Sequence, residues 1–171
     1  NIGRFTEQKD QMTFLKALNQ IKGIIKFEAI IVGRGKLHKD LLEYIERNDL
    51  TNFVKIINFV ENPFTLLKQT ELFILSSKYE GLPNVLLEAL TLRKFIISSN
   101  CPTGPKEILL NGKGGLLFNV GNHNQLSKKI LYYVKNKKKC LKMLQYAIQN
   151  LYRFDYQKNL KKYLNLINQI T

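Results

Sequence analysis

Two glutamates stand out in the segment 76–90. Glu80 lies in a polar stretch after an apolar run, and Glu88 lies inside a helix that we expect to begin near Pro83. Gly81 lets the backbone turn sharply, so the free N–H groups of the first helical turn could face a ligand. Glu80 could then accept hydrogen bonds from sugar hydroxyls, and Glu88 from ribose hydroxyls. A structural role fits these residues equally well, with Glu80 a favourable charge near a helix N-terminus and Glu88 a surface or ion-paired acid.

A second group of candidate residues opens the chain. Gly3 ends an apolar stretch, Arg4 follows it, and Lys9 stands where the next helix is expected to start. A guanidinium and an ammonium near a helix N-terminus could together hold a diphosphate, the first through paired hydrogen bonds and the second as a point charge. Arginine and lysine are also common in solvated loops, so the pattern alone leaves both interpretations open.

Two further loops contain glycine. The run from Val32 to Gly35 departs from the dinucleotide-binding fingerprint, because His38 stands where the third glycine is required. The phosphate-loop pattern also fails, since Ile30 and Glu107 stand where its first glycine would be needed. The glycines could still let a ligand approach the backbone closely. The loop 99–109 contains two prolines and a glycine, and it could close over a ligand or act as a plain connector.

The elements that must position these loops alternate in type. Apolar runs that suit buried parallel strands occur at 27–32, 53–59, 72–75, 95–98 and, more weakly, 116–120, and a further strand ends at Ile2. Residues with helical spacing separate these runs, and after Asn122 three helices are expected at 124–136, 138–152 and 156–169. We therefore expect an α/β fold, a Rossmann-like doubly wound parallel sheet with extra C-terminal helices, forming one domain over residues 1–171.

The formal net charge of +14 is unevenly distributed. From Leu126 to Thr171, eleven lysines and arginines face a single acid, Asp155. Such a tail fits an anionic partner, either a phospholipid surface or a nucleic acid, and fits solvated helix faces equally well. No apolar run approaches the roughly 20 residues of a membrane-spanning helix, and the first residues do not form a signal peptide. We expect a cytoplasmic location, with a peripheral position at the inner face of the membrane as one form of it.

The sequence contains little that could bind a metal. Cys101 and Cys140 are too few and too far apart for a disulfide framework or a structural zinc site, and His38 and His123 lack the spacing of ligands. The four aspartates form no Asp-x-Asp pair. We expect a metal-independent site with no cofactor, in which cationic side chains neutralise any bound diphosphate.

Taken together, these loops resemble the C-terminal domain of the retaining glycosyltransferases of family four, which have two Rossmann-like domains. Gly3-Arg4 with Lys9 is similar to the phosphate-gripping pair of that family. The run from Val32 to Gly35 is similar to its second glycine loop. The segment from Glu80 to Glu88 resembles its E-x7-E motif, with Gly-Leu-Pro inside it, and the segment 104–109 resembles the loop that follows. The resemblance covers nearly the whole chain.

The resemblance implies a nucleotide-diphosphate sugar as the donor substrate, most simply a UDP-hexose or UDP-N-acetylhexosamine. Arg4, Lys9 and Glu80 would be the catalytic residues. The two cations would neutralise the diphosphate and stabilise its departure, and Glu80 would contact hydroxyls of the donor sugar. Transfer would retain the anomeric configuration. The implied substrate-binding residues are Gly3, Gly33, Gly81, Leu82, Pro83, Asn84, Val85 and, at the ribose, Glu88.

The resemblance also implies partners. In that family the acceptor, a glycan or a lipid-linked acceptor, binds to an N-terminal domain of similar size that this chain does not contain. We expect weak donor binding and negligible transfer by the chain alone, because half of the cleft would be open to water. The loops that contain Glu80 and Cys101 resemble those of bacterial surface-polysaccharide and lipid-linked-glycan transferases.

Two other functions stay open on the sequence. A nucleotide-sugar epimerase of the same fold would need acid–base residues facing the sugar, and the combination of Arg4, Lys9 and two glutamates favours transfer over epimerisation. A non-catalytic basic module would bind a membrane or a nucleic acid through the tail. Nucleic acid is the less expected partner, and binding to it should depend steeply on salt.

Overall fold

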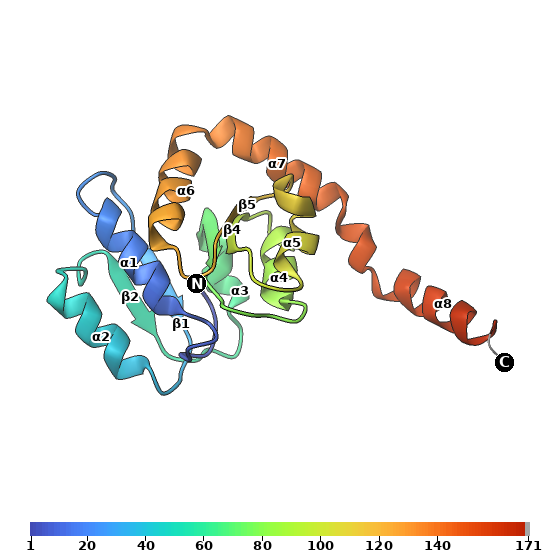
Figure 1. Cartoon of the computed structure of the whole chain (residues 1–171), viewed down its shortest axis with the longest axis horizontal. Helices are drawn as coiled ribbons and strands as arrows, with labels where there is room; N and C mark the ends of the chain where they lie inside the picture. The colour runs from blue at the N-terminus through green and yellow to red at the C-terminus, as the bar shows by residue number, and fades with distance from the viewer. Residues whose placement is uncertain (170–171) are drawn as a thin grey trace.

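The computed structural model describes residues 1–169 as parallel strands covered by helices (Figure 1). The strands are β1 (Ala29–Val32), β2 (Val54–Ile57), β3 (Leu72–Leu75), β4 (Phe95–Ser99) and β5 (Leu116–Phe118). The helices are α1 (Gln11–Ile21), α2 (His38–Arg47), α3 (Phe64–Gln69), α4 (Asn84–Thr91), α5 (Pro105–Ile108), α6 (His123–Lys135), α7 (Lys137–Gln149) and α8 (Tyr156–Ile167). Short 3-10 helices, η1 (Leu110–Gly112) and η2 (Leu151–Phe154), precede β5 and α8. The last two residues of the predicted domain, Ile170 and Thr171, lie outside the described residues.

All strand pairs are parallel, but hydrogen bonding divides the strands into two sheets. β1 pairs with β2, and β4 pairs with β3 on one side and β5 on the other. Residues 1–3 lie between the two sheets, where Ile2 forms a parallel bridge with Val32. The side-chain amide of Asn1 donates to the Ile74 carbonyl at 2.9 Å. The chain therefore has the expected Rossmann-like parallel arrangement, with a short connecting segment where the sequence predicts a strand that ends at Ile2.

Three strands are shorter than the sequence predicts. β1 begins at Ala29 rather than at residue 27, β2 occupies only the middle of 53–59, and β5 ends at Phe118 rather than at residue 120. Phe59 and Val120 are apolar but exposed, because the chain has already left the sheet at these positions. An apolar run thus overestimates the paired length of a strand. The three C-terminal helices lie within three residues of their predicted bounds.

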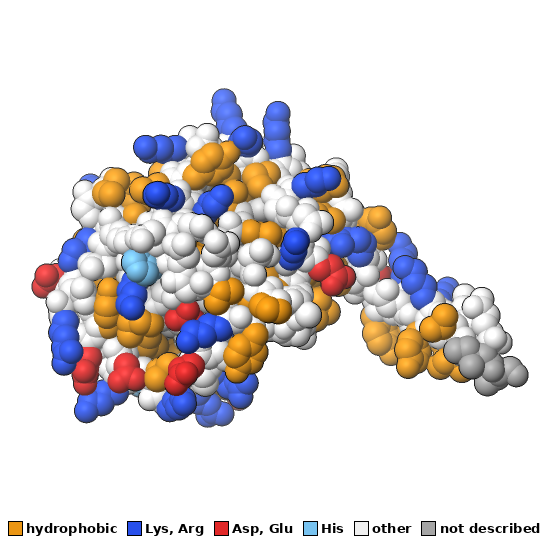
Figure 2. All heavy atoms as spheres, in the orientation of Figure 1, with side chains coloured by type: hydrophobic (Ala, Val, Ile, Leu, Met, Phe, Trp, Pro, Cys, Tyr) orange, Lys and Arg blue, Asp and Glu red, His pale blue; other side chains and the backbone are white. Residues whose placement is uncertain are grey.

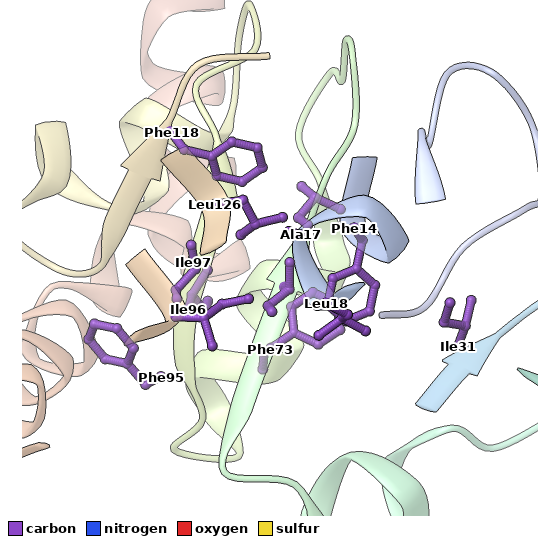
Figure 3. Packing of buried hydrophobic residues seen from close by; sticks show 14 of the residues in the cluster. Phe14, Ala17, Leu18, Ile31, Phe73, Phe95, Ile96, Ile97, Phe118 and Leu126 are labelled. Carbon is purple, nitrogen blue, oxygen red and sulfur yellow. The ribbon is translucent and has the colours of Figure 1, made fainter. Parts of the chain in front are cut away.

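The core lies where α1 and α6 pack against the strands. The helical spacing of Met12, Leu15, Leu18 and Ile21 predicts helix α1. The last three are buried, as is Phe14, whereas Met12 is only partly buried. Figure 3 shows Phe14 and Leu18 in one cluster with Phe73 of β3. All five residues of β4 are buried, so both faces of this strand are covered. Each buried Leu or Phe side chain contributes about 1.5–3 kcal/mol, which holds the strand ends, and hence the loops that follow them, in place.

Helix α8 differs from the rest because none of its residues is buried. It extends away from the body of the molecule (Figure 1). Figure 2 shows hydrophobic side chains gathered along one side of this C-terminal arm and basic ones on the other. The apolar residues Tyr156, Leu160, Tyr163 and Leu164 are between 37% and 72% exposed. No helix among residues 1–169 is both long enough and apolar enough to cross a membrane.

Candidate functional site

Two charged side chains meet at the carboxyl ends of the parallel strands. Nζ of Lys9, from the segment before α1, lies 2.7 Å from Oε1 of Glu80, in the loop after β3. Only 18% of the Lys9 side chain and 7% of the Glu80 side chain are exposed. Water therefore screens the pair poorly, and loss of either partner would leave an unbalanced charge in a largely buried place. The structure thus brings together two of the three predicted catalytic residues.

Further hydrogen bonds join the same two loops. The backbone N–H of Lys78 donates to the Gln8 carbonyl at 2.7 Å. The side-chain amide of Gln8 donates in return to the Tyr79 carbonyl at 3.1 Å. The ion pair therefore sits on two loops that are fastened to each other through their backbones, and its geometry does not depend on the charges alone.

Arg4 lies in a loop whose backbone is hydrogen-bonded by the buried side chain of Gln11. Its side chain is exposed and forms no salt bridge with any described residue, so the guanidinium is accessible to a ligand. The side-chain amide of Gln11 donates to the Arg4 carbonyl at 3.0 Å, and Gln11 is only 1% exposed. Oε1 of Gln11 has no partner among the described residues. Sequence reasoning missed Gln11, because one glutamine at the start of a helix has no distinguishing spacing.

The glycines at the end of β1 are explained by the packing of the chain itself. A Cβ at Gly33, where φ is +155°, would collide with the carbonyl oxygen of Gly3. A Cβ at Gly35 would collide with the backbone of Phe5. The sequence predicts that these glycines let a ligand approach the backbone. The structure shows that they make room for the backbone of residues 3–5 of the same chain. Gly3 and Gly33 therefore shape the loop that carries Arg4.

The loop after Glu80 is locked against the loop after β4. The hydroxyl of Thr103 donates to the Glu80 carbonyl. A Cβ at Gly104, where φ is +74°, would meet the Gly81 carbonyl oxygen and Cδ of Pro83. The loop 99–109 is thus more than a connector, because it fixes the backbone around Glu80.

The segment from Gly81 to Val85 leads into α4. The helix begins at Asn84, one residue after Pro83, and Pro83 provides no side-chain hydrogen bond at its cap. The N–H groups at the first positions of a helix have no partner within it, so those of Asn84 and Val85 are available to a ligand. Leu82 is 50% exposed beside them. The helix thus begins next to Pro83, as the sequence predicts, and its first N–H groups lie beside the Glu80 loop.

Glu88 lies in a neighbouring hollow between α3 and α4. This hollow has a volume of about 590 Å³ and is lined by Asn62, Phe64, Lys68, Asn84, Leu87, Glu88, Thr91 and Leu92. Glu80 and Lys9 do not line this hollow. The two glutamates therefore do not share one pocket. Asn84 lines the hollow and also opens the helix that follows the Glu80 loop, so it connects the two regions.

An exposed ring and a guanidinium lie at the ends of β1 and β2. The Arg34 guanidinium carbon is 5.0 Å from the centre of the Phe59 ring, and Phe59 is 59% exposed. An exposed aromatic ring beside a cation is a surface on which a flat, π-rich ligand can stack. Sequence reasoning assigned Phe59 to a strand and therefore missed it.

Cys101 lies in the loop after β4 and has a thiol that could in principle act as a nucleophile. Burial raises the pKa of the Cys101 thiol, which is 2% exposed. The thiol is therefore protonated at neutral pH, and both cysteines are free. Within residues 1–169, no three His, Cys, Asp or Glu side chains cluster in a way that could hold a metal ion.

Comparison with known proteins identifies the family. The sequence matches the family described as glycosyl transferases group 1 over residues 1–150. The chain belongs to this family. The glycosyltransferase chain is 42% identical over 110 residues to an uncharacterized glycosyltransferase of Methanocaldococcus jannaschii, covering 64% of its own length and 27% of that protein.

A second relative matches along the whole chain. It is the GalNAc-alpha-(1->4)-GalNAc-alpha-(1->3)-diNAcBac-PP-undecaprenol alpha-1,4-N-acetyl-D-galactosaminyltransferase of Campylobacter jejuni, 28% identical over 171 residues, with 99% of this chain and 47% of that protein covered. Among solved structures, S. aureus TarM in complex with fondaparinux, alpha-GlcNAc-glycerol and UDP superposes with a TM-score of 0.89 at 24% identity. That match covers 98% of this chain and 34% of TarM. The glycosyltransferase chain therefore spans less than half the length of these proteins.

Proposed function

We propose that this chain forms the donor-binding half of a retaining glycosyltransferase and binds a nucleotide-diphosphate sugar, with UDP-hexose or UDP-N-acetylhexosamine preferred. The observation that carries the proposal is the Lys9–Glu80 pair, in which a cation and a carboxylate from two different loops meet at 2.7 Å at the carboxyl ends of parallel strands. Ligands of such sheets bind at this edge. Membership of the glycosyltransferase family and the presence of UDP in a structural neighbour support the same ligand.

The proposed roles follow from the chemistry of each side chain. Arg4 and Lys9 neutralise the diphosphate, the exposed guanidinium by paired hydrogen bonds and the ammonium as a point charge. Glu80 accepts hydrogen bonds from hydroxyls of the donor sugar. The N–H groups of Asn84 and Val85 contact the phosphates or the sugar, as helix N-termini do with anions.

In this proposal the nucleoside binds next to the diphosphate site, in the hollow between α3 and α4. Glu88 accepts hydrogen bonds from the ribose within the 590 Å³ hollow. The Phe59 ring and the Arg34 guanidinium, at the end of β2 and β1, offer the nucleobase a stacking surface. Stacking of a base on an aromatic side chain contributes about 1–3 kcal/mol.

The reaction requires stabilisation of the departing diphosphate. Arg4 and Lys9 supply this in the proposed mechanism, since their charge lies where negative charge develops as the glycosidic bond breaks. The acceptor hydroxyl attacks the face that the diphosphate leaves and gives its proton to the departing diphosphate oxygen, so the anomeric configuration is retained. We propose that no metal ion takes part, and undiminished UDP binding in excess EDTA would support this. A strict requirement for magnesium or manganese would refute it.

We propose that the acceptor, a glycan or a lipid-linked acceptor, binds to a further domain that is present in full-length relatives. That domain would also cover the apolar side of α8. The match to TarM includes 98% of this chain, so α8 takes a comparable position in a much longer protein. Without such a domain the donor site is open to water, and transfer by the isolated chain should be negligible.

The basic C-terminal region supports a peripheral position at an anionic membrane. Lys138, Lys139 and Lys142 are exposed on α7 beside Leu141, which is 56% exposed. Mixed basic and apolar surfaces bind anionic lipid by charge attraction and shallow insertion. Sedimentation with vesicles that contain or lack acidic lipid tests this. Equal binding to both vesicle types would refute it.

Calorimetric titration of the chain with UDP, UDP-glucose, UDP-N-acetylglucosamine and GDP tests the donor proposal. We expect measurable binding of UDP and tighter binding of at least one UDP-sugar, with no turnover when an acceptor is added. Failure to bind any nucleotide diphosphate at millimolar concentration would refute donor binding. Robust transfer by the chain alone would refute the need for a further domain.

A further inference from the structure

Three buried serines lie directly behind the Lys9–Glu80 pair. Ser76 and Ser77 follow the last residue of β3, and Ser99 is the last residue of β4. All three side chains are fully buried. A buried hydroxyl destabilises a protein core unless it is hydrogen-bonded, and an apolar residue would pack there at lower cost. These buried hydroxyl groups therefore need hydrogen-bond partners within the chain.

Each hydroxyl donates to one of the two loops that carry the pair. Oγ of Ser77 donates to Oε1 of Glu80 at 2.5 Å. Oγ of Ser76 donates to the Lys9 carbonyl at 2.9 Å. Adjacent residues at the end of one strand thus hold both charged residues of the proposed site.

Ser99 supports this arrangement from the next strand. Its Oγ donates to the Ser77 carbonyl at 2.6 Å. The backbone of Ser77 is therefore fixed by β4 while its side chain fixes Glu80. The two hydrogen bonds form a short chain from the end of β4, through Ser77 in the loop after β3, to the carboxylate.

The carboxylate is held by one oxygen only. Oε1 of Glu80 accepts from both Lys9 and Ser77, whereas Oε2 has no donor among the described residues. A carboxylate can accept several hydrogen bonds, and a largely buried one normally has them satisfied. The anchored Oε1 thus leaves Oε2 oriented and available, as binding of a hydroxyl-bearing ligand requires.

We propose that Ser77 is a positioning residue that orients the Glu80 carboxylate toward the donor sugar, with Ser99 supporting Ser77 and Ser76 holding Lys9. This inference rests on the proposed donor function. Ser77 acts through Glu80 and does not itself touch the ligand. A serine that merely stabilised the loop would instead affect every part of the donor site equally.

Ser77→Ala, Ser77→Cys and Ser77→Thr test this inference by calorimetry with UDP and with the UDP-sugar that the wild-type chain binds best. Alanine and cysteine lose the strong donor, and cysteine keeps nearly the same volume, whereas threonine keeps the hydroxyl. We expect Ser77→Ala and Ser77→Cys to weaken UDP-sugar binding about tenfold, because a hydrogen bond to a charged group is lost. UDP binding should change less than about twofold, because UDP has no sugar at Glu80, and Ser77→Thr should restore the preference.

Ser98→Ala is the matched control. Ser98 is also fully buried on β4, but its Oγ donates to the Ser99 carbonyl and contacts neither Glu80 nor Lys9. It should leave both affinities close to wild type. Equal losses of UDP and UDP-sugar affinity in Ser77→Ala, or no loss of either, would overturn the proposed role.

A second measurement does not depend on the donor. In a double-mutant cycle of unfolding stability, Ser77→Ala and Glu80→Gln should be non-additive, whereas Ser98→Ala and Glu80→Gln should be additive. If the wild-type chain binds no nucleotide, the donor proposal fails while the cycle still decides whether Ser77 orients Glu80. Additivity of the first pair would refute the positioning role whatever the ligand.

Discussion

The ammonium of Lys9 contacts the carboxylate of Glu80 at 2.7 Å, although 71 positions separate them in the sequence. The cation proposed for the diphosphate and the carboxylate proposed for the sugar are therefore held together before a ligand binds. Each partially neutralises the other. Removal of the Lys9 charge should therefore mainly weaken binding of the diphosphate, and removal of the Glu80 charge should mainly weaken binding of the sugar.

We predict that Lys9→Ala weakens UDP binding by about tenfold or more, since a charge-assisted contact to phosphate is lost. Glu80→Gln should leave UDP binding equal or stronger, because Lys9 is freed, but should remove the preference for a UDP-sugar over UDP. Titration calorimetry at constant ionic strength measures both effects. Lys16→Ala, which removes an exposed lysine from α1, is the control and should bind as wild type. A loss of UDP affinity in Glu80→Gln as large as that in Lys9→Ala would contradict the assignment.

When the chain is produced with a free amino group at Asn1, its stability should fall between pH 8 and pH 5. The amino group of Asn1 donates to the Ile30 carbonyl at 2.9 Å, and burial lowers its pKa from 8.0 to about 5. In this interval the amine is neutral when folded and charged when unfolded, so the unfolded state binds more protons and a fall in pH favours it. We expect the free energy of unfolding to be about 2–3 kcal/mol lower at pH 6 than at pH 8.5, as measured by urea denaturation.

Acetylation of the amino terminus isolates this effect. An acetylated Asn1 keeps an N–H donor for Ile30 but has no charge to gain. Its stability should change much less over the same pH range, and the difference between the two forms reports the amine alone. Parallel pH profiles for both forms would show that the buried amine is not responsible.

Gly104→Ala should disturb the donor loop. An added Cβ would meet Gly81 and Pro83, and φ at this position is +74°. Gly121, with φ of +72° and no atom within 4 Å of such a Cβ, is the matched control. We expect Gly121→Ala to cost about 1–2 kcal/mol from backbone strain, and Gly104→Ala to cost clearly more and to weaken UDP-sugar binding. Equal thermal stabilities of the two variants would show that contact between the loops does not matter.

Removal of α8 should have little effect on the fold. None of its residues is buried, so deletion of residues 156–171 should change the free energy of unfolding of the isolated chain by less than about 1 kcal/mol. Deletion should also reduce self-association, because exposed apolar surface is lost. Denaturant unfolding and light scattering measure the two effects. A large loss of stability would show that α8 packs on the body of the chain in solution.

Some elements could be predicted closely and others could not. β3 was expected at its observed bounds, because a strand buried on both faces leaves a continuous apolar run in the sequence. The same rule predicts Phe59 in β2, but Phe59 is exposed, because β2 ends at Ile57 and the chain has left the sheet before residue 59. The predicted site residues Lys9 and Glu80 meet, whereas Glu88 lies in the adjacent hollow.

The residues that support the site could not be identified from the sequence. Ser77 and Gln11 are common residue types without a telling spacing, and their roles depend on which backbone and side-chain groups lie next to them in space. The glycines were recognised as important for a different reason from the one observed. Gly33 and Gly104 make room for neighbouring loops of the same chain, and no local pattern indicates which loop will be the neighbour.

The sequence by itself determined the alternation of strands and helices, the family, and the charged and glycine-rich loops at the strand ends, because each of these depends on residue types at short range. Only the tertiary structure decided that Lys9 pairs with Glu80, that serines at the ends of two strands support that pair, and that no residue of α8 is buried. These features depend on the order of parallel strands in space. That order is set by long crossover connections and by burial of the whole core, and not by neighbouring residues.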